Sequence, residues 1–145
     1  MSYKRKIIND PVFGFITIPN EFLYNLIIHP YFQRLNRIKQ MGLSNFVYPG
    51  AQHTRLLHST GAMFLMQEAI TTLRSKGQEI TDHEADSALA CILLHDVGHG
   101  PFSHALARTI VNDIYHEEIS LILMDELSKQ NNGRFDTCTP IFTNE

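Results

Sequence analysis

The sequence has few cysteines and no long apolar run, and each absence narrows the class of protein. Among its 145 residues only Cys91 and Cys138 are cysteines, which excludes a disulfide framework. Cys91 lies in an apolar run and is predicted to be a buried free thiol. No apolar stretch approaches the roughly 18 residues of a membrane-spanning helix, and residues 1–10 lack the apolar core of a signal peptide. We therefore expect a soluble, cytoplasmic protein without a membrane partner.

The chain also lacks a strong net charge, but its charges are unevenly distributed. The formal net charge of −3 does not indicate a nucleic-acid partner. Residues 1–55 contain seven Lys and Arg against two acidic residues, whereas the remainder contains five basic and thirteen acidic residues. A basic first third beside an acidic, histidine-rich second part is suited to holding a polyanion against a metal. Ordinary surface charge accounts for the same pattern.

Apolar periodicity and turn residues predict a single, mainly α domain with a small N-terminal β hairpin. Two short β-like runs, at 6–8 and 15–18, are separated by an Asn-Asp-Pro turn and a glycine. Helices are expected from 21 to the break at Pro30, and over 31–41, 54–75, 82–95, 103–112 and 116–128, with a loop over 44–52. A capping-box pattern begins at Thr81, and Gly77 is expected to end the preceding helix. The domain is expected to cover residues 1–128, followed by an irregular C-terminal tail over 129–145.

The densest group of chemically active residues is the segment HDVGHGPFSH at 95–104. Adjacent His95 and Asp96 offer an imidazole and a carboxylate, a pair that suits metals accepting nitrogen and oxygen ligands. His99 and His104 follow within the same ten residues, and the intervening glycines are expected to let the backbone approach a ligand closely. For a lone His-Asp pair, a helix that simply ends in a glycine-rich turn is the plainer alternative. Four such residues so close together favour a site.

Other helices contribute further candidates. His58 lies 37 residues before His95, and Arg55 is three residues before His58 and therefore on the same helix face. A metal ligand and a guanidinium on one face can hold a phosphate between them, because the Arg fork matches phosphate oxygens. His116 begins a late helix, where the helix dipole favours the neutral imidazole and suits it to proton transfer. Taken alone, Arg55 and His116 are each more typical of a protein surface than of a site.

Together these residues resemble the HD-domain deoxynucleoside triphosphate triphosphohydrolases. The resemblance extends to about residue 128 and rests on several ordered motifs. They are NDP at 9–11, FQRL at 32–35, IKQ at 38–40, YPGA at 48–51, HTRLLHS at 53–59, HDVGHGPFSH at 95–104 and HE at 116–117. The resemblance implies an HD-domain helical bundle that binds a divalent transition metal and hydrolyses dNTPs, including dGTP, to a deoxynucleoside and intact triphosphate. Fe, Mn, Ni, Co and Zn all fit the donor types, with Mg²⁺ as a companion of the substrate.

The same resemblance implies roles for individual residues, namely three metal ligands, two residues that line the site of water attack, and three substrate contacts. The ligands are His58, His95 and Asp96; the attack-site residues are His99 and His116; the substrate contacts are Arg55, His104 and Gln40. Arg55 and His104 are implied to contact phosphates, and Gln40 to read the sugar 3′-hydroxyl. In this chemistry a metal activates water, while Arg and His stabilise the charge that develops on the phosphates. A homo-oligomer is expected, because family members are usually oligomers.

Three departures from the family pattern affect the expected activity. The family's metal site is completed by an Asp on a later helix, but Asp125 lies about 180° round the helix from His116, and the only later Asp lies in the tail. The chain is therefore expected to be the N-terminal part of a longer protein. Ala107 replaces an acidic residue that partners the catalytic His. Ile28 and Asn36 replace the acidic residue and the Arg of a nucleotide-sensing site, so a guanine-nucleotide switch of that design is not expected.

Three functions stay open on the sequence alone. The first is a dNTP triphosphohydrolase. The second is an HD hydrolase of another nucleotide or phosphoester, because HD sites are shared across such enzymes. The third is a catalytically inactive, truncated HD fragment that folds and associates without turnover, which the missing carboxylate and Ala107 favour.

Overall fold

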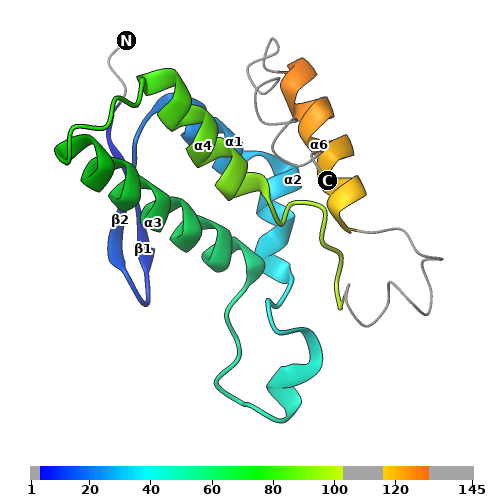
Figure 1. The fold of residues 1–145 in the computed structure, drawn as a ribbon. Helices are drawn as coiled ribbons and strands as arrows, with labels where there is room; N and C mark the ends of the chain where they lie inside the picture. Colours follow the sequence, from blue (N-terminus) through cyan, green and yellow to red (C-terminus); the bar gives the residue numbers. More distant parts are fainter. Residues whose placement is uncertain (1–3, 103–115, 131–145) are drawn as a thin grey trace.

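The architecture is mainly α with an N-terminal hairpin, as predicted (Figure 1). The computed structural model describes residues 4–102 and 116–130. Its elements are β1 Lys6–Asp10, β2 Gly14–Ile18, α1 Glu21–Ile28, α2 Pro30–Gln33, the 3-10 helices η1 Arg34–Arg37 and η2 Gly42–Phe46, α3 Arg55–Ser75, α4 Asp82–Leu94 and α6 His116–Gln130. None of these helices combines the length and apolarity needed to cross a membrane. The helix predicted over 103–112 lies outside the described residues, together with His104, Ala107 and Cys138.

The hairpin forms where the sequence predicts it. Strands β1 and β2 pair antiparallel, with Lys6 opposite Ile18 and Asp10 opposite Gly14. The buried Asp10 carboxylate accepts the backbone N–H groups that follow it in the turn, at 2.8 and 2.9 Å, and Gly14 adopts a φ of +73° that closes the turn. Ile16 and Ile18 alternate toward the core and are buried. The hairpin is therefore anchored by one face of β2.

Helices α3 and α4 form the central pair, and local signals set their ends. Thr54 caps α3, and Thr81 forms a complete capping box with Glu84 at the start of α4. Gly77, with a φ of +84°, lets the chain reverse after α3. Because the two helices run side by side in opposite directions (Figure 1), the start of α3 lies next to the end of α4. This arrangement brings the HTRLLHS and HDVGHGPFSH motifs together.

Apolar side chains from β2 and from helices α1, α2, α3, α4 and α6 fill one core. In α1 the buried residues are Leu23, Leu26 and Ile27. The core also includes Leu93 of α4 and Leu127 of α6, both 0% exposed. Each fully buried Leu contributes roughly 1.5–3 kcal/mol through removal from water. Cys91 is buried, as predicted.

The prediction of one helix over 31–41 is wrong. Helix α2 ends at Gln33, the chain tightens into η1, and Ile38 is extended at φ −111° and ψ 118°. The next residues pair with the segment before α3 instead of continuing a helix: Lys39 bridges Thr54, and the N–H of Arg55 donates to the carbonyl of Ile38 at 2.8 Å. Tertiary pairing thus replaces the helical hydrogen bonds.

Two smaller differences concern the flanks of this segment and the last helix. The short η2 begins at Gly42 and occupies part of the predicted loop over 44–52. Three apolar residues of the segment predicted as a helix, Phe32, Leu35 and Ile38, are all buried. Helix α6 continues to Gln130, past its predicted end at 128.

Candidate metal centre

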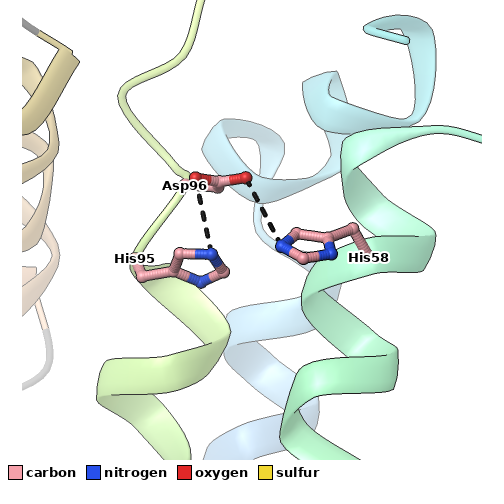
Figure 2. A group of neighbouring side chains, drawn as sticks. All are labelled: His58, His95 and Asp96. Atoms are coloured by element: carbon pink, nitrogen blue, oxygen red, sulfur yellow. Dashed lines mark ion pairs between the residues drawn. The ribbon is translucent and has the colours of Figure 1, made fainter. Parts of the chain in front are cut away.

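The three predicted metal ligands meet at the junction of α3 and α4. His58 comes from the first turn of α3, His95 is the C-cap of α4, and Asp96 follows it. Their ligand atoms all lie within 4.8 Å of one another (Figure 2). Two imidazole nitrogens and one carboxylate oxygen are donors that divalent transition metals accept. The residues present therefore fit a divalent metal.

The end of α4 sets the orientation of His95. The Nδ1 of His95 lies 2.7 Å from the carbonyl oxygen of Ile92, one turn earlier, so this nitrogen carries the proton and donates. The Nε2 then points toward Asp96, 3.4 Å from Oδ1. Imidazole ligands are commonly fixed in this way, with the ring nitrogen opposite the metal donating to a carbonyl.

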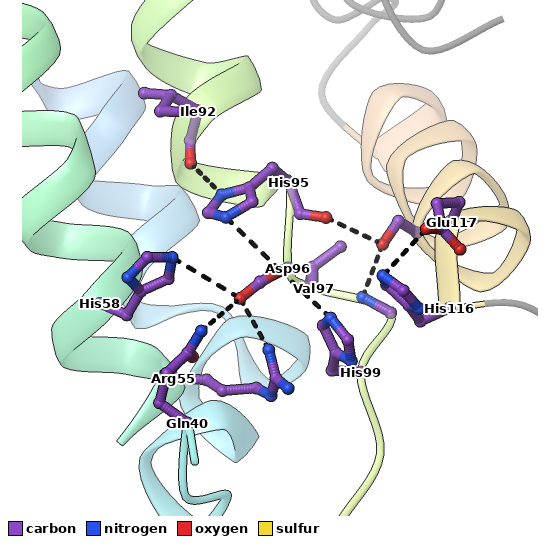
Figure 3. Close-up of polar contacts among 12 residues, drawn as sticks. Gln40, Arg55, His58, Ile92, His95, Asp96, Val97, His99, His116 and Glu117 are labelled. Carbon is purple, nitrogen blue, oxygen red and sulfur yellow. Dashed lines mark hydrogen bonds and ion pairs between the residues drawn. The ribbon is translucent and has the colours of Figure 1, made fainter. Parts of the chain in front are cut away.

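The Asp96 carboxylate is the centre of the polar network (Figure 3). Its Oδ2 lies 2.8 Å from Arg55 Nη1 and 3.5 Å from Gln40 Nε2, and its Oδ1 lies 3.2 Å from His99 Nε2. Burial by itself would raise the pKa of Asp96, but the hydrogen bond from His99 and the charges of His95 and Arg55 hold it well below its usual range. Asp96 is therefore ionised at neutral pH and available as a ligand.

His58 is held as a neutral imidazole. Partial burial lowers the pKa of His58, and the attraction of Asp96 compensates only in part. Its ring packs edge-on against that of His95, with centroids 5.3 Å apart. His58 Nε2 lies 3.9 Å from Asp96 Oδ2, a separation too long for a hydrogen bond. The geometry leaves its lone pair directed toward the shared centre.

Two predicted substrate contacts lie beside the ligands. Arg55 is 3% exposed, and it reaches Asp96 from the same face of α3 as His58, as the spacing of three predicts. Its Nε is buried and has no hydrogen-bond partner among the described residues. The buried Oε1 of Gln40 also has no partner in that part of the chain. Both groups are polar atoms for which a bound ligand would supply partners.

The two predicted attack-site histidines are stacked on each other. The rings of His99 and His116 lie 3.7 Å apart between centroids and 21° from parallel. His99 follows the end of α4, whereas His116 is the first residue of α6 and lies with its Nε2 3.1 Å from Glu117 Oε1. Because His99 also touches Asp96, the stack connects α6 to the candidate metal centre (Figure 3).

The close approach of α6 depends on Gly98. A Cβ placed on Gly98 would lie 2.1 Å from the carbonyl oxygen of His116 and 2.4 Å from the backbone nitrogen of Ser120. The Ser120 hydroxyl accepts the Gly98 N–H at 2.9 Å and donates to the carbonyl of His95 at 3.2 Å. The sequence predicted that Gly98 would let the backbone approach a ligand closely, but the structure shows α6 packed against Gly98 instead. Gly100, by contrast, has no described residue within 4 Å of such a Cβ.

Two features of this region were missed on the sequence. Ser120 carries no local signal, since its role depends on the packing of α6. Arg34 donates to the backbone carbonyls of Val97 and His99 in the turn after α4. It belongs to the FQRL motif, but nothing in its spacing indicates this contact. Asp125, considered unfavourable as a further ligand, pairs with Lys129 Nζ at 2.6 Å on the exposed face of α6.

Comparison with known proteins identifies relatives. The chain is 39% identical over 135 residues to human deoxynucleoside triphosphate triphosphohydrolase SAMHD1, and 42% identical over 136 residues to the mouse protein. The predicted relationship to the HD-domain deoxynucleoside triphosphate triphosphohydrolases is confirmed. These matches cover 87% of this chain but only 21% and 20% of the SAMHD1 proteins. No family model matches the chain.

Two bacterial proteins are also similar to this SAMHD1-related chain. The uncharacterized protein YwfO of Bacillus subtilis is 35% identical over 117 residues, which are 81% of this chain and 27% of YwfO. A crystal structure of a phosphohydrolase from Bacteroides thetaiotaomicron superposes with a TM-score of 0.94 and 60% identity, over 98% of this chain and 35% of that protein. The chain therefore spans about a fifth to a third of the length of the proteins it matches.

Proposed function

We propose that this chain carries the metal site of an HD-type phosphohydrolase that converts dNTPs to a deoxynucleoside and triphosphate. The observation that carries the proposal is the convergence of His58, His95 and Asp96 within 4.8 Å. The similarity to SAMHD1 supports nucleotides as the substrate class. The phosphohydrolase from Bacteroides thetaiotaomicron supports phosphoester hydrolysis as the reaction class.

The donor set supports a divalent transition metal of the Fe, Mn, Co, Ni or Zn group, with Mg²⁺ accompanying the substrate. When bound by His58, His95 and Asp96, this metal supplies Lewis acidity toward water and a phosphoryl oxygen. Asp96 is the ligand best prepared for it, because its pKa is held below the usual range by the surrounding donors.

The remaining polar residues are proposed to position the substrate and move protons. Arg55, with its partnerless Nε, binds phosphate oxygens and stabilises charge that develops on them. His104 is proposed to assist from the sequence motif alone. The stacked His99 and His116 transfer protons at the site of attack. Gln40 accepts a hydrogen bond from the sugar 3′-hydroxyl through its buried Oε1.

Three finer properties belong to the same proposal. dGTP is included among the substrates, and the protein acts in the cytoplasm. A homo-oligomer is supported by an exposed apolar loop around η2, where Phe46 is 80% exposed, Val47 73% and Tyr48 67%. Contiguous exposed apolar side chains of this kind are typical of protein interfaces.

Metal analysis and turnover measured on the same sample test the proposal. The purified chain is loaded separately with Mn²⁺, Fe²⁺, Co²⁺, Ni²⁺, Zn²⁺ or Mg²⁺, and release of inorganic triphosphate from each dNTP is measured. Asp96→Asn should lose both metal and activity. Asp82→Asn, which changes an exposed carboxylate at the other end of α4, is the matched control and should lose neither.

The outcomes separate the open functions. Inorganic triphosphate released from dGTP supports the proposal. Turnover of monophosphates or cyclic nucleotides alone supports an HD hydrolase of another phosphoester. Bound metal without any turnover supports a catalytically inactive fragment. Unchanged metal content and activity in Asp96→Asn would contradict the site itself.

A further inference from the structure

We propose that Arg34 is a positioning residue of the candidate metal centre. It holds the turn between Asp96 and His99 in place through the turn's own backbone carbonyls. The inference rests on the proposed function, because it concerns how the residues of the site are positioned relative to one another. Within the described residues, the guanidinium of Arg34 donates to the backbone carbonyls of His99 and Val97 and not to the three candidate ligands, so its action is indirect.

The guanidinium of Arg34 donates to two backbone carbonyl groups at once. From η1, its Nη1 donates to the carbonyl oxygen of His99 at 2.7 Å, and its Nη2 donates to the carbonyl oxygen of Val97. These two carbonyls lie 65 and 63 residues away in sequence. A guanidinium can do this because its donors are fixed in a planar fork, which a lysine lacks.

The two carbonyl groups that accept from Arg34 belong to residues beyond the end of α4. Helix α4 ends at Leu94, and the following turn has its own bonds from Val97 N to Leu94 O at 2.9 Å and from His99 N to Asp96 O at 3.1 Å. Several carbonyls at a helix end lack helical partners. Arg34 supplies charged donors to two carbonyls in this turn, where such bonds are stronger than neutral ones.

Fixing these carbonyls also fixes the side chain of His99. The His99 ring lies between two contacts, 3.2 Å from Asp96 Oδ1 on one side and stacked 3.7 Å from His116 on the other. A shift of the His99 backbone would alter both contacts together. Arg34 therefore couples η1 to the alignment of the ligand Asp96 with the attack-site histidines.

Arg34 is better suited to positioning than to binding phosphate. Both of its terminal nitrogens are already engaged by carbonyl oxygens. Arg55, by contrast, retains a buried Nε without a partner among the described residues. The two arginines thus divide the work, with Arg34 acting on the backbone and Arg55 on charged groups.

The first test is spectroscopic and needs neither metal nor activity. In metal-free protein, the stacked rings of His99 and His116 should shift each other's ring-proton NMR signals upfield. Arg34→Gln and Arg34→Lys should reduce this shift, with the lysine variant intermediate. Arg74→Gln is the matched control, because Arg74 also donates from its guanidinium to a backbone carbonyl, that of Ile80, at 2.7 and 3.0 Å. It lies 16 residues beyond His58 on α3, about 24 Å along the helix, and should leave the shift unchanged.

The second test uses turnover of the metal-loaded protein. Loss of a residue that orients a metal site typically costs 10–100-fold in activity, and we expect a fall of roughly that size in kcat for Arg34→Gln. KM should change little, because ground-state binding is not affected. The double variant Arg34→Gln/His99→Ala should be no slower than His99→Ala alone, because the two residues act as one unit.

The results distinguish this inference from the proposed function. If the wild-type protein shows no turnover but the histidine signal is altered in Arg34→Gln, the proposed activity is refuted and the positioning role still stands. An unchanged histidine signal, or multiplicative effects in the double variant, would overturn the positioning role. If the Arg34 variants do not fold, the test is made on the wild-type protein. NMR couplings across the hydrogen bonds from Arg34 to the two carbonyls support the positioning role, and their absence contradicts it.

Discussion

The two ends of the α3–α4 pair each join an arginine to an aspartate, in opposite surroundings. At the end where a short loop connects α3 to α4, Arg74 pairs with Asp82 at 2.9 Å, with side chains 38% and 98% exposed. At the other end, Arg55 meets Asp96 at 2.8 Å, with side chains 4% and 10% exposed. The ion pairs are chemically the same, but only the second is buried and ringed by histidines. The comparison shows that burial and neighbours, not the pair itself, make the candidate site.

The largest expected effect comes from breaking the buried pair. Arg55→Met leaves the Asp96 charge buried without its guanidinium, which should lower the free energy of unfolding by about 3 kcal/mol. Urea denaturation of the metal-free protein measures this, and Arg74→Met is the exposed counterpart. The double variant Arg55→Met/Asp96→Asn should recover part of the loss, because the unpaired charge is gone. Equal losses for Arg55→Met and Arg74→Met would contradict the comparison.

A second prediction concerns α6, which packs against the turn at the buried end. Gly98→Ala places a Cβ 2.1 Å from the His116 carbonyl, so α6 must move away from the turn. Overpacking of this kind typically costs about 1–3 kcal/mol, and the His99–His116 stack should open. Ring-proton NMR shifts and urea denaturation measure the two effects. Gly50→Ala, where no described residue lies within 4 Å of the new Cβ, is the control; equal effects of the two alanine variants would contradict close packing of α6 on Gly98.

A smaller loss is expected from Ser120→Ala. Its hydroxyl bonds the Gly98 N–H and the His95 carbonyl at 2.9 and 3.2 Å, and both groups would lose a partner. An unsatisfied buried group costs about 1–3 kcal/mol, and we expect the lower end because water can approach the smaller side chain. Ser75→Ala, which removes an exposed hydroxyl bonded to the carbonyl of Thr72 at 2.8 Å, should have no measurable effect. A comparable loss at both serines would argue against a special role for the α6 contact.

The aspartate at the buried end should also make stability depend on pH. The pKa of Asp96 is lowered in the folded protein, so the unfolded chain binds more protons in acid and stability falls as pH decreases. The contribution is complete above the unfolded-state pKa of about 3.9 and is lost progressively below it. Asp96→Asn should flatten this acid slope in metal-free protein. Identical acid slopes for wild type and Asp96→Asn would rule out the proposed electrostatics.

Much of the fold could be predicted because its signals are local. Thr54 and Thr81 cap the helices they precede, and Gly77 takes the positive φ that ends α3. The helix over 31–41 could not be delimited in this way, since Ile38 and Lys39 leave helical geometry to pair with a segment far along the chain. That pairing is a tertiary interaction, and it overrides local helix propensity.

The residues of the candidate site likewise fall into two groups, those that a local sequence motif predicts and those whose role depends on tertiary packing. The cluster of His58, His95 and Asp96 could be anticipated from motifs whose residue types carry their chemistry. Arg34 and Ser120 could not, because each acts on backbone atoms of the turn after α4 and its role depends on how distant elements pack. Side-chain chemistry is visible in a sequence, but contacts to backbone carbonyls are not.

The most direct test of the central claim is the location of a bound metal. Crystals grown with Zn²⁺ and measured at its absorption edge should show an anomalous peak between His58, His95 and Asp96, at roughly 2.0–2.2 Å from the ligand atoms. The peak should be absent in Asp96→Asn and retained in Asp82→Asn. A metal bound elsewhere, or a peak that survives in Asp96→Asn, would contradict the assignment of this buried junction as the metal centre.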